Sequence, residues 1–410
     1  MSLTLKEENF VVIDIGSYIT KAGIGTQDTN KPPSTFVNMA DYNNPIKNNN
    51  IVSWEDLEAS WQHILFKELG IKKARNEHPV LFTVPVHWNK LEHERLTQIA
   101  FEYLNVPGLY IAPQPLMALY GCGSVTGLVV DIGHNTTDIN VVVDSILQPS
   151  SNMTIHIGGN ILNQYLLQLL QGDNNLVQQC EQAGVKLDEE FATFIREKCD
   201  ICYVAMGHEL QETASTTDES NLAGGIAAAT SEEITDNETT VEEEEDNKDI
   251  PENVEIEYQG HKFTIGPYRH KVYDPLFKPD LMGIDTLSLR NAMFLAVNNC
   301  EPPEIRPKLW ENIVLTGGCG QMRGLQKRVK ADLGHVLSIS ENAGDTQTRL
   351  VGFLRIPDYF TVLKNKEFQQ YSTWLGAEIV AKLVFTDAKN YVSKVDYNES
   401  GPSVCHTKSY

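Results

Sequence analysis

The sequence predicts an α/β fold built from two similar domains, and three apolar runs predict it. Residues 10–13 and 127–130 are short apolar runs, and each is followed directly by Asp-Ile-Gly. A third run, residues 311–316, leads straight into Gly317 and Gly318. Continuous apolar runs of this length are typical of strands buried on both faces, and a glycine after the run marks a tight turn. Because the first motif occurs twice, we expect duplicated α/β domains.

The remaining segments predict the elements that connect and cover these strands, because apolar residues recur at strand or helical spacing. The expected strands are residues 18–23, 78–84 and 136–143, and the expected helices are residues 54–69, 91–104, 114–120, 158–170, 191–206 and 374–385. We expect the last helix to be amphipathic. Leu375, Ile379 and Leu383 form its apolar face, and Glu378 and Lys382 lie on a polar one.

Length, charge and cysteine content restrict the class of protein. The chain has 410 residues, of which 41% are hydrophobic, and this exceeds one compact domain. A net charge of −22 argues against a phosphate-neutralising surface, so we expect no direct nucleic-acid contact. The sequence has no signal-peptide pattern and no apolar run near the roughly 20 residues that span a bilayer, so we expect no membrane partner. Cys199 and Cys202, expected on a helix, are interpreted as buried thiols in a reducing compartment.

Residues 211–255 differ in composition from the rest of the chain. They contain fifteen Asp and Glu residues against one lysine, Lys248, and almost no large apolar residues. Such a segment buries too little apolar surface to offset the entropy of ordering it, so we expect a mobile, acidic surface insertion. A solvating loop is favoured over a docking site for a basic partner.

The three strand ends together predict a nucleotide site. A glycine-rich turn after a strand exposes backbone N–H groups that can cradle phosphate oxygens. Asp14 and Asp131 stand at the ends of the two repeated strands, where carboxylates can hold a hydrated Mg²⁺. Gly317 and Gly318 allow a purine or ribose to approach the backbone closely. Each motif alone is common, but the three in this order indicate a nucleotide clamp.

Four segments of the chain look like consecutive segments of one known family: residues 51–58, 77–81, 96–102 and 393–403. In them the chain resembles actin and the actin-related proteins, and the resemblance extends over nearly its whole length. It implies the fold of actin, sugar kinases and Hsp70-type ATPases, with four subdomains around an ATP cleft. The implied boundaries are 1–33, 51–121 and 372–410 for subdomain 1, 34–50 for a truncated subdomain 2, 122–157 and 258–371 for subdomain 3 with part of 4, and 158–257 for subdomain 4 with the acidic insertion.

The resemblance also implies which residues bind ATP with Mg²⁺. Gln114 matches the glutamine that positions the hydrolytic water. Asp14 and Asp131 are implied to hold Mg²⁺ through its waters. The implied nucleotide-binding residues are Asp14, Gly16, Ser17, Tyr18, Lys21, Asp131, Gly133, His134, Lys198, Gly317 and Gly318.

Several positions depart from the family pattern. The departures are Tyr18 for a glycine, His134 for an aspartate, Asn135 for a glycine and Cys199 for the acid that holds the ribose. A small local insertion could instead place Arg196 and Glu197 at the last position. We therefore expect ATP as a structural ligand and no useful turnover, because in-line attack needs the phosphates and the metal held correctly.

Two further features bear on assembly. Residues 34–50 stand in for the long second subdomain whose tip docks into the next subunit of an actin filament. Self-polymerisation is not expected, since a head-to-tail filament needs both faces of the contact. Tyr120, Val380 and Leu383 match the groove between subdomains 1 and 3 of actin, which takes amphipathic helices from partners. The alternative for these three residues is ordinary core packing.

Three functions stay open at this point. The favoured one is a nuclear subunit of a chromatin remodeller of the SWI/SNF or RSC type. In that family, such a subunit clamps a helix of the motor subunit, often together with a second actin-related protein. The first alternative is a cytoplasmic pointed-end subunit of dynactin, and the second is a weak actin-like ATPase. The nuclear localisation rests on resemblance alone, because the sequence has no compact basic import run.

Overall fold

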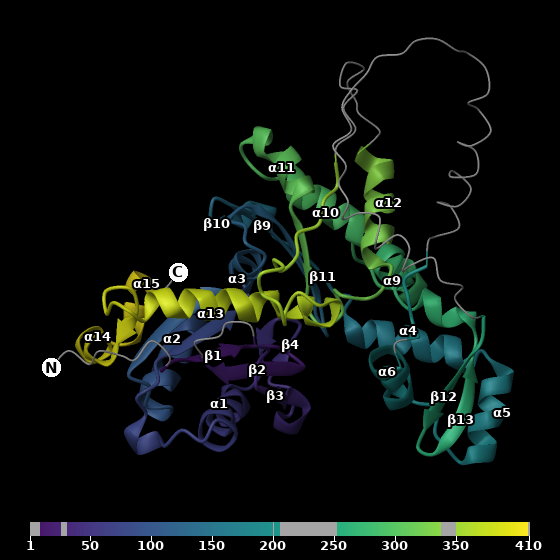
Figure 1. Cartoon of the computed structure of the whole chain (residues 1–410), viewed down its shortest axis with the longest axis horizontal. Coiled ribbons are helices and arrows are strands. Elements are labelled where there is room, and N and C mark those ends of the chain that lie inside the picture. The colour runs from purple at the N-terminus through teal and green to yellow at the C-terminus, as the bar shows by residue number, and fades with distance from the viewer. Residues whose placement is uncertain (1–8, 26–30, 200, 206–251, 338–349, 409–410) are drawn as a thin grey trace, which may run out of the picture. The chain divides into compact units, whose positions relative to one another are not determined.

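The computed structural model describes residues 9–25, 31–199, 201–205, 252–337 and 350–408. Figure 1 shows the course of the chain, which divides into two compact units. Unit 1 consists of Met1–Asn160, Ile284–Gln321 and Arg349–Tyr410, and unit 2 consists of Ile161–Gly283 and Met322–Thr348.

Unit 1 contains two main sheets. The first has the strand order β15-β7-β6-β1-β2-β3, and the second has the order β10-β9-β8-β14 with β11 also paired to β9. The strands of the first sheet are β1 (Val11–Asp14), β2 (Ile19–Ile24), β3 (Thr35–Asn38), β6 (Val80–Val84), β7 (Gly108–Pro113) and β15 (Val392–Ser393). The strands of the second are β8 (Gly127–Ile132), β9 (Thr137–Val143), β10 (Ile146–Leu147), β11 (Met153–Ile155) and β14 (Ile313–Thr316).

The same strand arrangement occurs once in each sheet, which confirms the predicted duplication. β1 pairs antiparallel with β2 and parallel with β6, just as β8 pairs antiparallel with β9 and parallel with β14. Asp14 lies opposite Thr83 of the parallel strand, and Asp131 lies opposite Thr316. The repeated aspartates therefore occupy equivalent places at the ends of two equivalent strands.

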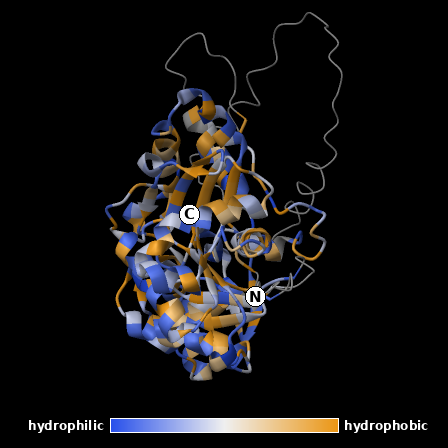
Figure 2. Cartoon of the chain, turned by 90° about the vertical axis from the view of Figure 1, so that its left-hand side faces the viewer, coloured by the Kyte–Doolittle hydropathy of each residue, from blue (hydrophilic) through white to orange (hydrophobic). Residues whose placement is uncertain are grey.

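The central strands are buried on both faces, as their continuous apolar sequence predicts. Val11 and Ile13 of β1 belong to one hydrophobic core, whereas Phe10 and Val12 belong to another on the opposite face. Figure 2 shows hydrophobic residues along the strands, while the helices carry both hydrophobic and hydrophilic residues. No helix in the described part of the chain is both long enough and apolar enough to cross a bilayer.

Helices of unit 1 cover these sheets and follow the predicted segments closely. Residues 54–69 and 91–104 each form an α-helix that continues as a π-helical turn, at Ile64–Glu68 and Ile99–Tyr103. The α-helices of this unit are α1 (Trp54–His63), α2 (Lys90–Gln98), α3 (Gln114–Gly121), α10 (Leu289–Asn298), α11 (Arg306–Glu311), α13 (Ser372–Val384), α14 (Lys394–Ser400) and α15 (Cys405–Lys408).

Helices α3 and α13 pack with their backbones in contact, and α13 also packs on β1 (yellow in Figure 1). Two glycines permit this approach. A Cβ atom at Gly376 of α13 would lie 1.9 Å from the carbonyl oxygen of Met117, and one at Gly121 of α3 would lie 2.0 Å from that of Ser372. Only a residue without a side chain fits at either position, so the crossing of the two helices depends on the glycine pair.

The two predicted faces of α13 do not separate buried residues from exposed ones. Glu378, on the polar face, is 2% exposed, whereas Leu383, on the apolar face, is 66% exposed. Leu375 is fully buried, as expected. The helix lies between α3 and β1, so its buried surface extends around more of its circumference than a simple apolar stripe.

Unit 2 is formed mainly by helices and one hairpin. Its α-helices are α4 (Gly159–Gln171, beginning in unit 1), α5 (Asn174–Ala183), α6 (Glu189–Lys198), α9 (Asp274–Phe277) and α12 (Leu325–Leu337), and its strands are β12 (Val254–Tyr258) and β13 (His261–Ile265). The fully buried Arg269 donates to the carbonyl oxygens of Ile201 at 3.0 Å and Glu252 at 2.8 Å. One side chain therefore holds both ends of the segment between those two residues.

Two predicted boundaries in unit 2 are corrected. The helix expected over residues 191–206 ends at Lys198, and Cys202 lies in a segment without regular secondary structure. Cys202 is buried as interpreted, whereas Cys199 is half-buried. The segment leaves the helical path because the N–H of Val204 bonds to the carbonyl oxygen of Arg323, 2.8 Å away. The acidic insertion predicted to reach residue 255 ends earlier, since β12 begins at Val254, and its residues 211–251 lie outside the described residues.

Residues 34–50, predicted as a truncated subdomain 2, form ordered structure within unit 1. β3 extends the first sheet at its edge, and β4 (Ile46–Lys47) pairs with β5 (Asn50–Ile51) in a short hairpin. The division into four subdomains stays a prediction.

Candidate nucleotide-binding site

The first predicted phosphate loop is the turn that joins β1 to β2. Gly16 stands at its centre, and a Cβ atom there would lie 2.1 Å from the carbonyl oxygen of Ile19. Glycine is therefore required by the tightness of the turn itself. Ser17 and Tyr18 follow it as a bend and are half-buried.

Asp14, at the end of β1, is 4% exposed and held by three side chains. Its Oδ1 accepts hydrogen bonds from Thr83 Oγ1 at 2.6 Å and from Gln114 Nε2 at 3.2 Å. Its Oδ2 pairs with Lys21 Nζ at 3.0 Å. Burial acts to lower the pKa of Lys21, but the charge and hydrogen bond of Asp14, together with the charge of Asp131, outweigh burial and raise that pKa. The charge of Asp14 is thus paired within the protein.

Gln114 is the first residue of α3, and its side chain is attached to the first loop. Its Nε2 donates to the carbonyl oxygen of Ile15 at 2.6 Å as well as to Asp14. The amide nitrogen of the side chain that the family resemblance assigns to the hydrolytic water is therefore held by loop atoms.

The second predicted loop follows Asp131 at the end of β8. Burial raises the pKa of Asp131 to about 7, with Asp138 and Asp14 adding to the rise and Lys21 opposing it. Asp138 is the residue paired with Asp131 across the β8–β9 ladder. In the first sheet the equivalent place opposite Asp14 is held by Lys21. The two repeats thus carry opposite charges beside their aspartates.

The third predicted turn follows β14 and touches the second loop. Gly317 has φ +85°, and a Cβ atom there would lie 2.2 Å from Asp131 Oδ1. A Cβ atom at Gly318 would have no other atom within 4 Å. Gly317 therefore permits close packing against the aspartate, while Gly318 borders open space. Lys198 ends α6 in unit 2, and its role at this site stays a prediction.

The two departures in the phosphate loops meet each other. The ring of Tyr18 in the first loop stacks on the ring of His134 in the second, with centroids 4.2 Å apart and planes 14° from parallel. The backbone of the second loop is also held by the start of α4. The carbonyl oxygens of Gly133 and His134 accept hydrogen bonds from the N–H groups of Gly159 and Asn160, at 2.9 Å each. The structure therefore brings the two loops together through side chains that the family pattern lacks.

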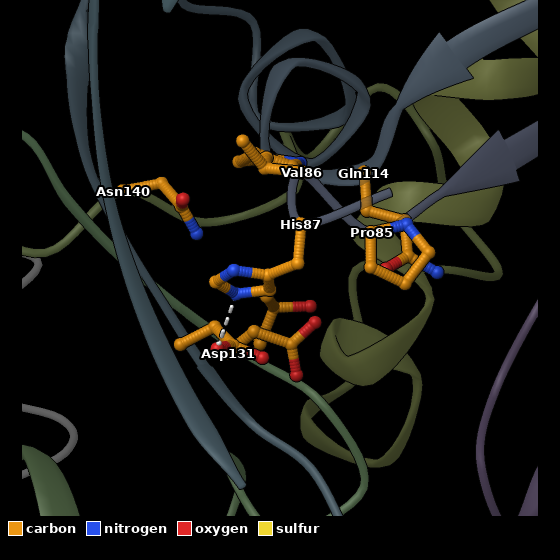
Figure 3. A pocket seen from close by; sticks show the side chains of 9 residues that line it. Pro85, Val86, His87, Gln114, Asp131 and Asn140 are labelled. Carbon is orange, nitrogen blue, oxygen red and sulfur yellow. Dashed lines mark hydrogen bonds and ion pairs between the residues drawn. The ribbon is translucent and has the colours of Figure 1, made fainter. Parts of the chain in front are cut away.

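A small pocket lies beside these loops (Figure 3), with a volume of about 20 Å³. Its lining includes the predicted residues Gln114 and Asp131. It also includes His87 and Asn140, whose side chains project into the pocket in Figure 3. Asn140 is 3% exposed, and its Oδ1 has no hydrogen-bond partner in the described part of the chain. A donor such as water fits this position.

His87 and Asp138 form an ion pair on the pocket wall (dashed line in Figure 3), with His87 Nε2 2.9 Å from Asp138 Oδ1. The hydrogen bond to Asp138 raises the pKa of His87. Burial acts to raise the pKa of Asp138, but hydrogen bonds from His87 and Thr154 outweigh it and the pKa is lowered. Sequence reasoning missed this pair. The repeat itself could have indicated Asp138. It lies seven positions after Asp131, just as Lys21 lies seven positions after Asp14 in the first copy.

The metal prediction concerns two carboxylates only. Among the residues that the structure describes, no group of three or more His, Cys, Asp or Glu side chains is placed to hold a metal ion. Asp14 and Asp131 are oxygen donors, which suits a Mg²⁺ ion that keeps most of its waters.

The three predicted groove residues lie on α3 and α13. Tyr120 and Val380 are half-buried and pack against the core that α3 and α13 share. Leu383 stands three residues after Val380, on the same side of the helix, and is exposed. Tyr120 and Val380 therefore contribute to core packing, which was the alternative interpretation. Leu383 faces solvent, as a residue of a partner-binding groove would.

Comparison with known proteins gives matches along the whole chain. The actin family model matches residues 34–410. The chain is 26% identical to Actin-related protein 7 of Oryza sativa subsp. japonica, over 98% of this chain and 99% of that protein. It is 26% identical to the SWI/SNF and RSC complexes subunit arp9 of Schizosaccharomyces pombe, over 89% of this chain and 78% of that protein. It is 28% identical to Actin-like protein 9 of Mus musculus, over 89% of this chain and 73% of that protein. Together with the duplicated strands and their paired aspartates, these matches establish that the chain belongs to the actin family, as a divergent actin-related protein.

Proposed function

We propose that this protein is a non-polymerising structural subunit of a nuclear, ATP-dependent chromatin-remodelling complex of the SWI/SNF or RSC type. A relative that matches most of this chain is named as a subunit of those complexes. The observation that carries the proposal is the surface of α3 and α13, where the two helices meet through a glycine pair and leave apolar side chains at the rim.

The proposed docking face consists of Tyr120, Val380 and Leu383. Leu383 is the exposed member, at 66%, and Val380 lies one turn before it. A partner helix can cover such a face with residues spaced three and four apart along its own sequence. We propose that the partner is a helix of the motor subunit, and that a second actin-related protein binds beside this one.

We propose ATP with Mg²⁺ as a structural ligand of the two loops and the turn at Gly317 and Gly318. The space beside Gly318 fits a group that lies flat on the backbone, and Asp131 supplies a carboxylate oxygen toward a hydrated cation. When bound, ATP supplies the phosphate charge that backbone N–H groups of such loops attract. Turnover is not part of the proposal, because Gln114 is engaged by Ile15 and Asp14.

Affinity capture of the tagged full-length chain from native nuclear extract tests the partner. We expect a remodeller motor subunit to co-purify with the wild-type chain and to be lost with Leu383→Glu. The matched control is Leu91→Glu, since Leu91 is also exposed, at 74%, and lies outside the docking face. Recovery of no motor subunit by the wild-type chain would refute the proposal, and equal recovery by both variants would refute the docking face.

A further inference from the structure

The β4–β5 hairpin of residues 46–51 ends in a turn whose shape is set by its own sequence. Lys47 pairs with Asn50, so the turn consists of Asn48 and Asn49. Both have positive φ, at 47° and 64°. A two-residue hairpin turn with both φ values positive is the type I′ turn, and asparagine is one of the few residues that adopt it readily. The conformation of the tip is therefore favoured by its own two residues, independently of its contacts with other segments.

This preformed tip contacts the second phosphate loop through Asn49. The amide nitrogen of Asn49 lies 3.0 Å from each carboxylate oxygen of Asp138. The amide oxygen of Asn49 accepts from Thr136 Oγ1 at 3.2 Å. One side chain thus donates to a charged group and accepts from its neighbour, and hydrogen bonds to charged groups are the stronger class.

Asp138 accepts hydrogen bonds from further protein side chains. In addition to Asn49, His87 Nε2 lies at 2.9 Å and Thr154 Oγ1 donates at 2.6 Å. Thr136 Oγ1 also lies 3.2 Å from Asp138, but its single proton is the one that Asn49 accepts. The hairpin and the loop are therefore joined at Asp138 by several protein side chains.

We infer that the hairpin of residues 46–51 is a strap that orders the second phosphate loop in the absence of nucleotide, with Asn49 as the positioning residue. Residues 34–50, predicted as a truncated subdomain 2, thereby acquire a role inside their own chain. For its effect on affinity the inference rests on the nucleotide binding proposed above. A loop that is already ordered costs less to bind, and an affinity falls in proportion to the fraction of molecules that are competent.

Hydrogen exchange of the ligand-free protein tests the strap directly. Asn49→Gly removes the amide and keeps a residue that tolerates positive φ. Asn48→Gly makes the same backbone change at the exposed neighbour, whose side chain takes no part in the contact with Asp138. We expect amides of residues 132–140 to exchange about tenfold faster in Asn49→Gly than in Asn48→Gly, because the loop opens locally. Equal exchange in the two variants would overturn the inference.

A second variant covers the case in which Asn49→Gly does not fold. Thr136→Val removes the hydroxyl that donates to Asn49 and lies 3.2 Å from Asp138, and it keeps the shape of the side chain. It should speed hydrogen exchange over residues 132–140 relative to the wild-type protein, by a smaller factor than Asn49→Gly does. Exchange equal to that of the wild-type protein would count against the strap.

Mg-ATP separates the strap from the nucleotide proposal. We expect Asn49→Gly to bind Mg-ATP more weakly than Asn48→Gly does. Saturating Mg-ATP should then return its exchange over residues 132–140 toward the level of Asn48→Gly. If no variant responds to Mg-ATP, the nucleotide proposal fails, while the ligand-free comparison still decides the strap. If Mg-ATP binds both variants equally, Asn49 is not a positioning residue.

Discussion

Tyr18 of the first phosphate loop stacks on His134 of the second, with ring centroids 4.2 Å apart. Both positions depart from the pattern that the family resemblance implies, and they are 116 positions apart in the chain. Their contact shows that these two departures form one structural feature. The rings join the two loops that are predicted to bind phosphate.

Removing either ring of this stack should affect nucleotide binding in the same way. We expect Tyr18→Gly and His134→Ala each to lower the stability of the ligand-free protein by about 0.5–1.5 kcal/mol, the range for stacked rings. Each should weaken Mg-ATP binding, since loops that are no longer held together must be ordered when the ligand binds. Isothermal titration calorimetry measures the affinity. The double variant should lose less than the sum of the two single ones, because both remove the same stacking contact, and additive effects would contradict the coupling.

The close contact between α3 and α13 predicts that two glycine-to-alanine substitutions change the stability of the protein in opposite directions. Gly376→Ala should destabilise the protein by about 1–3 kcal/mol or more, because the new methyl group would overlap the carbonyl oxygen of Met117. Gly334→Ala is the control, since a Cβ atom there meets nothing within 4 Å and Gly334 lies within α12. It should stabilise the protein by about 0.5–1 kcal/mol. Differential scanning calorimetry distinguishes the two signs.

The ion pair of His87 and Asp138 predicts a stability difference that decreases with rising pH. The pKa of His87 is raised above its ordinary value of 6.5, so the charged imidazole stabilises the folded state. That contribution is fully present below pH 6.5 and is lost as the pH rises through the raised pKa. His87→Gln should therefore cost about 1 kcal/mol near pH 6, and less near pH 9. Urea unfolding at the two pH values tests this, and a cost independent of pH would contradict it.

Asp131 predicts a pH dependence in the same direction as that of His87, but burial is its main cause. Its folded pKa is about 7 against an ordinary value of 3.8, so the folded state prefers the neutral acid. The contribution to stability is present below pH 3.8 and is lost as the pH rises through 7. Asp131→Asn should therefore melt at a higher temperature than the wild-type protein at pH 8.5, with the difference decreasing toward pH 5. The same variant should weaken binding of Mg-ATP, which distinguishes loss of a ligand group from a general gain in stability.

Most of the strands and helices could be predicted from local sequence. The Asp-Ile-Gly repeats marked β1 and β8, because each follows a buried apolar run, and at Gly16 the turn after the strand leaves no room for a Cβ atom. Local pattern was less reliable where tertiary contacts override it. α6 stops at Lys198 because residues 201–205 bond to distant backbone groups, and no local residue signals that end.

The sequence by itself determined the duplicated nucleotide-type fold, since strand burial, glycine turns and the placement of Asp14 and Asp131 all follow from short-range pattern. Only the tertiary structure decided what surrounds those aspartates. The contact of Asn49 with Asp138 spans 89 positions, and that of Tyr18 with His134 spans 116. Such pairings depend on how separate loops converge in space, and the periodicity of a segment carries no information about the segment that will face it.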